Sequence, residues 1–280
     1  HYGDFYAFQV VKDGDKLSLG KRELTFVTLP MLHWPDSMAT YCADDGILFS
    51  NDAFGQHYAA AKRFDDAVDL GILFYEAKKY FANILWPYAK LIDKALAKAA
   101  ALDLKMIATA HGIIWRSHIQ EIIAKYAAWG KGVSGSSVVI AYDTMWGATE
   151  QMARAVLEGV VSAGSDAVLL RMNETPNSTA VADLFEAGGM IIGSSTLNSG
   201  MLPTMGSLLV YLKGLNPTGK KAAVFGTYGW AGGAQKDMEA LLTAAGFELE
   251  PGFTCKWKAQ PEDLEAARQL GYEFARKLQK

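Results

Sequence analysis

The sequence predicts an α/β protein whose C-terminal part is a doubly wound parallel sheet. After a Gly- and Ser-rich stretch at residues 130–136, five short apolar runs alternate with segments of helical periodicity. Small polar residues follow three of these runs, as expected where the strands of a parallel sheet end. Before residue 130, β-rich segments come first and helical segments follow, which indicates a separate unit. We therefore expect two domains, at residues 1–132 and 133–280.

Length and composition fit this division. A chain of 280 residues suggests about two domains, and its hydrophobic content of 50% with 20% charged residues is typical of globular proteins. The net charge of −3 argues against nucleic acid as a partner. No apolar run is long enough to cross a membrane. Cys42 and Cys255 are far apart, and no signal peptide is visible, so we expect reduced thiols in a cytoplasmic protein.

The first domain is expected to begin with β-hairpins. Asp13-Gly14 and Asp44-Asp45-Gly46 are turn signals between β-branched and aromatic runs. Pro87 interrupts a long helical pattern rich in Ala, Lys and Leu. The expected strands are 8–12, 16–19, 23–29, 39–43, 47–50 and 105–110. The expected helices are 74–86, 91–102 and 117–128.

The second domain alternates regularly between strands and helices. The expected strands are 138–142, 167–172, 190–193, 221–226 and 248–254. The expected helices are 149–162, 178–186, 205–213, 233–244 and 261–279. Such a sheet binds its ligands beyond the carboxyl ends of its strands.

The loop after the first of these strands has the features of a phosphate site. Thr144 and Thr149 bring hydroxyls, and the following helix brings free backbone N–H groups and the positive end of its dipole. The loop contains no Lys or Arg, which suits a phosphate monoester. The sequence lacks both the GK[ST] of a P-loop and a G-x-G-x-x-G dinucleotide fingerprint. An ordinary strand-to-helix turn would look similar in isolation.

Two further loops can complete a flavin site. Tyr228 and Trp230 offer flat apolar faces for an isoalloxazine ring, and glycines allow close approach of the backbone. Alternatively, Trp230 belongs to a core or an interface. Together the three loops resemble the FMN site of the flavodoxin superfamily, and FMN is expected rather than FAD. The expected cofactor-binding residues are Thr144, Met145, Trp146, Gly147, Ala148, Thr149, Ser195, Thr196, Leu197, Asn198, Thr227, Tyr228, Gly229, Trp230 and Gly232.

Three residues of the first domain are candidate metal ligands. His33, Asp52 and His111 each follow an expected strand, and imidazole and carboxylate groups suit iron, manganese or zinc. Judged alone, each histidine is more often a hydrogen-bonded loop residue, and the common position after a strand favours the interpretation as ligands. His57 and His118 have no such context, so we interpret them as surface or structural residues.

The whole chain resembles the flavodiiron proteins, in particular those of the rubredoxin:oxygen oxidoreductase type. The segments that carry the resemblance are SLGKRELTF, MLHWPDSM, LFSNDAFGQ, the AHG at residues 110–112, and YDTMWGATEQMAR. The resemblance implies a metallo-β-lactamase-like αββα domain with two irons, followed by a flavodoxin-like FMN domain. It also implies that His33 and His111 are terminal iron ligands and that Asp52 bridges the two irons.

One motif of the resembling family is absent. Its H-x-E-x-D-H sequence should precede the matched region, and no part of this chain fits it. We therefore expect only the second half of the lactamase-like domain here, with the remaining metal ligands supplied from outside these 280 residues.

The resemblance implies reduction of dioxygen to water or of nitric oxide to nitrous oxide. Electrons would come from a rubredoxin-like donor, pass through FMN and reach the irons. It further implies a head-to-tail homodimer in which each flavin faces the partner's metals. Two alternatives remain: an FMN electron-transfer module without gas reduction, and a zinc hydrolase, since lactamase-like folds commonly hydrolyse.

Overall fold

The computed structural model describes residues 6–132 and 134–279. The chain divides into two compact units, His1–Gly132 and Val133–Lys280, within the Gly- and Ser-rich stretch. Each unit is described by itself. No helix in the described residues is both long and apolar enough to cross a membrane.

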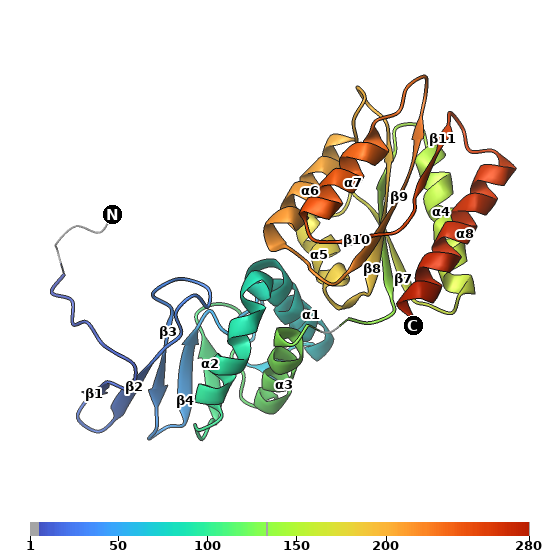
Figure 1. Cartoon of the computed structure of the whole chain (residues 1–280). Helices are drawn as coiled ribbons and strands as arrows, with labels where there is room; N and C mark the ends of the chain where they lie inside the picture. The colour runs from blue at the N-terminus through green and yellow to red at the C-terminus, as the bar shows by residue number, and fades with distance from the viewer. Residues whose placement is uncertain (1–5, 133, 280) are drawn as a thin grey trace. The chain divides into compact units, whose positions relative to one another are not determined.

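Unit 1 contains a five-stranded sheet in the order β1-β2-β3-β4-β5 (Figure 1). Its strands are β1 (Lys16–Ser18), β2 (Glu23–Thr28), β3 (Met38–Cys42), β4 (Ile47–Asn51) and β5 (Met106–Thr109). Neighbouring strands are antiparallel except β4 and β5, which are parallel. Strands β2, β4 and β5 therefore run in the same direction, and their carboxyl ends lie at the same edge of the sheet.

Three helices pack on one face of this sheet. They are α1 (Leu70–Tyr80), α2 (Ile92–Ala99) and α3 (Ile119–Gly130). The strand residues that face them are apolar and alternate along each strand, as in Ala39, Tyr41 and Leu48. Phe49 points to the other face and is 48% exposed. The helices and one sheet face thus form the αβ half of a sandwich.

The expected hairpin at Asp13-Gly14 is wrong. Residues 8–12 form no strand, and β1 instead pairs with β2 across residues 19–22, where Leu19 N–H donates to the Arg22 carbonyl. Asp13 accepts hydrogen bonds from the amide and hydroxyl of Thr28, so its carboxylate closes a turn against β2. Asp13-Gly14 does form a turn, but residues 8–12 before it pair with no strand.

The helical pattern around Pro87 is also divided differently. Helix α1 begins at Leu70, because Asp69 caps it by accepting the Ile72 amide at 2.9 Å. A π-helical turn follows at Phe81–Leu85, and a 3₁₀ turn at Trp86–Leu91 contains Pro87.

Unit 2 is a parallel sheet with helices on both faces, as predicted. Its strands are β6 (Val138–Asp143), β7 (Ala167–Arg171), β8 (Gly189–Ser195), β9 (Lys221–Tyr228), β10 (Glu248–Leu249) and β11 (Phe253–Lys256). The order is β7-β6-β8-β9, with β10 and β11 both paired to β9. This is a doubly wound strand order. In such a sheet, ligands bind beyond the carboxyl ends of the strands, at the point where the strand order reverses.

The expected last strand, 248–254, forms in two pieces. Pro251 lacks an N–H for the ladder, and the backbone of Gly252 lies so close to the Val224 carbonyl that a Cβ would come within 2.0 Å. After this break, β11 extends to Lys256, two residues further than predicted.

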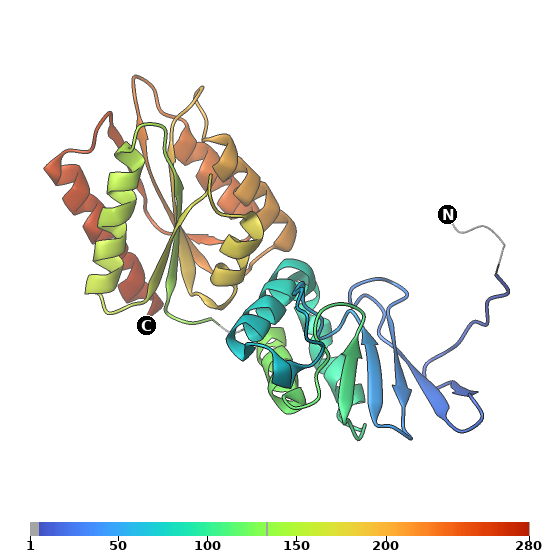
Figure 2. The ribbon, with the colours of Figure 1, turned by 180° about the vertical axis from the view of Figure 1, so that it is seen from behind.

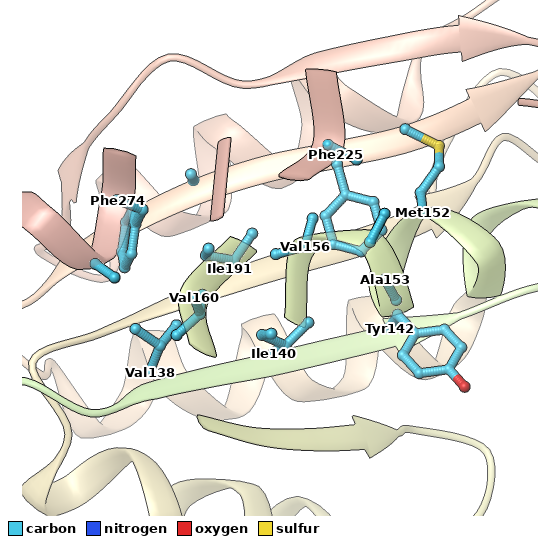
Figure 3. Close-up of a cluster of buried hydrophobic side chains, with 14 of the residues drawn as sticks. Val138, Ile140, Tyr142, Met152, Ala153, Val156, Val160, Ile191, Phe225 and Phe274 are labelled. Atoms are coloured by element: carbon cyan, nitrogen blue, oxygen red, sulfur yellow. The ribbon is translucent and has the colours of Figure 1, made fainter. Parts of the chain in front are cut away.

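The helices of unit 2 are α4 (Ala148–Ser162), α5 (Asn177–Glu186), α6 (Pro203–Leu215), α7 (Ala234–Ala244) and α8 (Pro261–Leu278). Helices α4 and α8 cover one face of the sheet, and α5, α6 and α7 cover the other (Figures 1 and 2). Figure 3 shows the core under α4 and α8, where Val156 and Val160 pack against Ile140, Phe225 and Phe274. This core fixes α4, and with it the loop that precedes α4.

Candidate functional site

Four loops of unit 2 gather at the carboxyl ends of β6, β8, β9 and β11, at the upper end of the unit in Figure 1. They enclose an open cavity of about 660 Å³. A volume of this size is in the range of small-molecule and cofactor sites. The predicted cofactor residues that line it are Met145, Trp146, Ala148, Ser195, Thr196, Leu197, Asn198, Thr227, Tyr228, Gly229 and Trp230.

The predicted phosphate loop joins β6 to α4. Gly147 has a φ of 84°, and its N–H donates to the Thr144 hydroxyl at 3.1 Å, which closes the loop. Helix α4 begins at Ala148, so the first-turn N–H groups have no partner within the helix and point out of its N-terminus. These donors form a site for an anion without any cationic side chain.

Thr149 has a different position from the one we expected. Its hydroxyl is buried and lies 2.9 Å from both the Ser195 and the Thr227 hydroxyl oxygens. Thr149 lies in the first turn of α4, Ser195 ends β8, and Thr227 lies near the end of β9. We call Thr149, Ser195 and Thr227 the hydroxyl triad; it ties the start of α4 to the ends of these two strands.

Aromatic side chains line the cavity in three of its loops, with Trp146 in the phosphate loop and others after β9 and β11. Trp230 is 87% exposed, which excludes the alternative that it belongs to the core of the described fold. Its ring lies 6.4 Å from that of Trp257, with an interplanar angle of 50°. Trp257 packs on the backbone of Gly229, where a Cβ would lie 3.0 Å from the indole ring. The cavity thus presents flat apolar surfaces suited to a planar ring system.

The fourth loop of the cavity was not predicted from the sequence. Trp257 and Lys258 follow β11 and line the cavity, together with Gln151 of α4. The signal was available, because an aromatic residue and a cation follow the last expected strand. The sequence pattern did not show that the strand resumes after Pro251 and continues to Lys256, so the loop after it was not expected at the cavity. Conversely, Thr144, Gly147, Thr149 and Gly232 are not among the residues that line the cavity.

The three candidate metal ligands come together at one edge of the unit 1 sheet. Nε2 of His33 lies 3.5 Å from Oδ2 of Asp52, and Nε2 of His111 lies 3.7 Å from Oδ1 of the same carboxylate. All three side chains are a quarter to a third exposed. Each oxygen of Asp52 therefore faces a different imidazole, an arrangement that suits a carboxylate shared by two cations.

The orientation of His111 is set by its neighbours. Nδ1 lies 3.2 Å from the carbonyl of Gln56, so donation there leaves the lone pair of Nε2 directed toward Asp52. Gly55 makes room for this ring, since a Cβ at that position would lie 2.7 Å from it. The buried amide of Gln56 bonds the carbonyls of Phe54 and Ile113 and the amide of Ile113, which fixes the loop.

His57 is closer to this cluster than its sequence context indicated. Its ring lies 5.2 Å from that of His111 and meets Tyr80 edge-on. Burial, and secondarily the charge of Asp52, raises the pKa of the Tyr80 hydroxyl far above its usual range. His118 instead bonds Glu121 at 2.7 Å, in keeping with a structural role.

Within the described ranges, no group of three or more His, Cys, Asp or Glu side chains could hold a metal ion by itself. The contacts of His33 and His111 run pairwise through Asp52, so each cation would receive one nitrogen and one oxygen from this chain. Imidazole and carboxylate are ligands that suit iron. The donor set fits a di-iron centre in type and direction, and further ligands would be required for each metal.

Two protein families match parts of the sequence. Residues 140–271 match the flavodoxin family, and residues 1–112 match the ODP family of beta lactamases. The two matches fall in unit 2 and unit 1 respectively.

Several known proteins are similar along nearly the whole chain. A protein named nitric oxide reductase from Moorella thermoacetica is 45% identical over 99% of this chain and 71% of its own length. The anaerobic nitric oxide reductase flavorubredoxin of Klebsiella pneumoniae is 37% identical, and the chain spans 58% of it.

Solved structures agree with these matches. The flavodiiron protein of Giardia intestinalis has a TM-score of 0.93 at 36% identity, over 96% of this chain and 68% of that protein. The rubredoxin oxygen:oxidoreductase of Desulfovibrio gigas has a TM-score of 0.92 at 37% identity, over 97% of this chain and 69% of that protein.

Proposed function

The chain belongs to the flavodiiron protein family, and from this premise we propose that it takes part in reducing dioxygen to water or nitric oxide to nitrous oxide. We propose a rubredoxin-like protein as electron donor. The names of its relatives support both gases, namely nitric oxide reductase for one and rubredoxin oxygen:oxidoreductase for another. The same three side chains, His33, Asp52 and His111, would serve either gas.

The observation that carries this proposal is the position of Asp52 between His33 and His111. A flavin cavity alone would serve an electron-transfer module equally well. An electron-transfer module does not need a carboxylate whose two oxygens face two different imidazoles, as those of Asp52 do. When bound, iron supplies gas binding and reduction, and FMN supplies electron transfer.

The residues of this chain have separate tasks. Amides at the start of α4 would bind the phosphate of FMN, and Trp230 and Trp257 would flank its ring. The carbonyl of Gln56 would hold the His111 imidazole with Nε2 directed at the metal. The ring of Tyr80 lies beside the His111 imidazole and would pack against this ligand.

We also propose a head-to-tail homodimer in the cytoplasm. Both cysteines of the chain are free and buried, which suits a reducing compartment. In such a dimer each flavin would deliver electrons to the metals of the partner.

Substitution of Asp52 tests whether its carboxylate, which lies between His33 and His111, binds iron. In the protein completed with the further metal ligands, Asp52→Ala should lower the affinity for iron by at least about tenfold, since even indirect partners of a metal site contribute that much. It should leave FMN bound and abolish gas consumption with reduced rubredoxin as donor. The matched control is Asp36→Ala, which removes an exposed carboxylate from the loop that carries His33. This variant should keep its iron affinity and its gas consumption.

The outcomes separate the alternatives. Full iron content in Asp52→Ala would show that Asp52 is not a ligand. Zinc in place of iron, with hydrolysis and no gas consumption, would favour the hydrolase. In the unsubstituted protein, bound flavin and full iron content without gas consumption would favour the electron-transfer module. Extraction of predominantly FAD would contradict the phosphate site, because α4 offers a monoester site and no adenosine fingerprint is present.

A further inference from the structure

We propose that Lys258 raises the reduction potential of the flavin bound in the unit 2 cavity. This role rests on the proposed binding of FMN there. It goes beyond that function because it assigns a control of the electron-transfer driving force to a residue outside the three expected cofactor loops.

The charges around the cavity single out Lys258. Among the described residues that line the cavity, it is the side chain that carries a full charge at neutral pH; the others are apolar, amide, hydroxyl or aromatic. The phosphate loop contributes neutral donors. A cation in such surroundings acts on a nearby charge with little competition from counter-charges in the cavity wall.

The backbone that carries Lys258 is held on both sides. Trp257 N–H donates to the Tyr228 carbonyl at 2.7 Å, which continues the β11–β9 ladder by one residue. The carbonyl of Lys258 accepts the side-chain amide of Gln260, and Gln260 begins the capping box of α8. The position of the residue is therefore fixed by a strand and a helix, although its ammonium is exposed.

The sheet order separates Lys258 from the phosphate loop. That loop follows β6, and Lys258 follows β11, with β8 and β9 between them. Three strand spacings of roughly 4.8 Å place the two loops about 14 Å apart across the sheet. Of the four aromatic residues that line the cavity, Trp146 lies in the phosphate loop, and Tyr228, Trp230 and Trp257 belong to the ends of β9 and β11 next to Lys258. The cation therefore lies where most of the aromatic surface gathers.

The chemistry of the ring gives the sign of the effect. Two-electron reduction of a flavin with uptake of one proton at N5 leaves a negative charge at N1 and the adjacent carbonyl. A cation near the ring stabilises this reduced anion and does little for the neutral oxidised ring. The electrons come from the external donor, and Lys258 neither gives nor takes a proton.

The test compares Lys258→Met with Lys256→Met in the FMN-loaded chain. Both lysines are exposed and lie two positions apart, but Lys256 does not line the cavity. Spectroelectrochemistry gives the two-electron midpoint potential, and titration gives the Kd of oxidised FMN. We expect Lys258→Met to weaken binding of reduced relative to oxidised FMN about tenfold, which is a fall of about 30 mV for a two-electron couple. The fall should shrink as salt is raised.

Each result decides the matter. An unchanged potential in Lys258→Met, or an equal fall in Lys256→Met, would overturn the role of Lys258. Equal weakening of both redox states would place the ammonium at the phosphate and would also overturn it. Failure of the unsubstituted chain to bind FMN would overturn the proposed function, a separate result seen before any variant is made. A fall confined to Lys258→Met, with melting temperatures unchanged, supports the role.

Discussion

At the scale of single residues, the exposure of Trp230 indicates a ligand. A large indole that is 87% exposed in a cavity gains by covering a planar ring. Replacing Trp230 with Ala should remove about 1–3 kcal/mol of stacking, which weakens FMN binding roughly tenfold or more. Fluorescence titration with FMN measures this. Trp34→Ala, at an exposed tryptophan of unit 1, is the control, and an unchanged Kd in Trp230→Ala would remove Trp230 from the flavin site.

Lys220 makes the stability of unit 2 depend on pH. The residue is 4% exposed, its ammonium donates to the Ala187 carbonyl, and burial lowers its pKa from 10.5 to about 8. Between these two values the unfolded chain binds more protons than the folded chain, so the free energy of unfolding rises with pH. The slope should reach at most about 1.4 kcal/mol per pH unit. Below pH 8 the cost of burying the charge is fully present.

Urea unfolding of Lys220→Met across this pH range tests the point. The variant should lack the rise, whereas Lys213→Met, at an exposed lysine, should keep it. Parallel curves for the unsubstituted chain and Lys220→Met would show that Lys220 titrates normally.

At the scale of elements, the hydroxyl triad connects helix α4 to strands β8 and β9 at the candidate flavin site. Thr149 brings the first turn of α4 to the ends of β8 and β9 through two hydrogen bonds. Thr149→Val keeps the shape but removes both bonds, which should cost about 1–2 kcal/mol of stability. FMN should also bind more weakly, because the three loops lose their common attachment.

Denaturant unfolding and FMN titration measure the two effects of Thr149→Val. Thr243→Val, which removes an exposed hydroxyl of α7, should change neither. Loss of stability with an unchanged Kd for FMN would mean that the triad supports the fold alone.

At the scale of the whole molecule, the proposed head-to-tail dimer predicts complementation between two inactive variants. With the further metal ligands supplied, Asp52→Ala loses the metal site, and a double variant with Thr149→Val and Trp230→Ala stays without flavin at FMN concentrations below its weakened affinity. If electrons pass from the flavin of one chain to the metals of the other, mixed dimers contain one intact pair and regain part of the gas consumption. Mixing, unfolding and refolding the two proteins before the assay measures this.

The measure of the mixed dimer is its activity relative to each variant refolded alone. Activity no higher than the sum of the separate variants would show that electrons pass within one chain. A monomer by analytical ultracentrifugation would contradict the dimer itself.

Local sequence patterns were sufficient to predict the alternation of strands and helices in unit 2 and the three loops that line most of the cavity. These features depend on local patterns: periodicity of apolar residues, turn residues and the short loops after strands. The residues His33, Asp52 and His111 could be named for the same reason, since each follows a strand.

Which of these residues come into contact is set by the tertiary structure. It paired β1 with β2 instead of with residues 8–12, divided the last strand at Pro251, and added Trp257 and Lys258 to the cavity. It also turned the Thr149 hydroxyl inward and placed one oxygen of Asp52 before each histidine. The physical reason is that hydrogen-bond partners and side-chain directions are set by groups distant in the chain, and local periodicity does not encode which of them will come into contact.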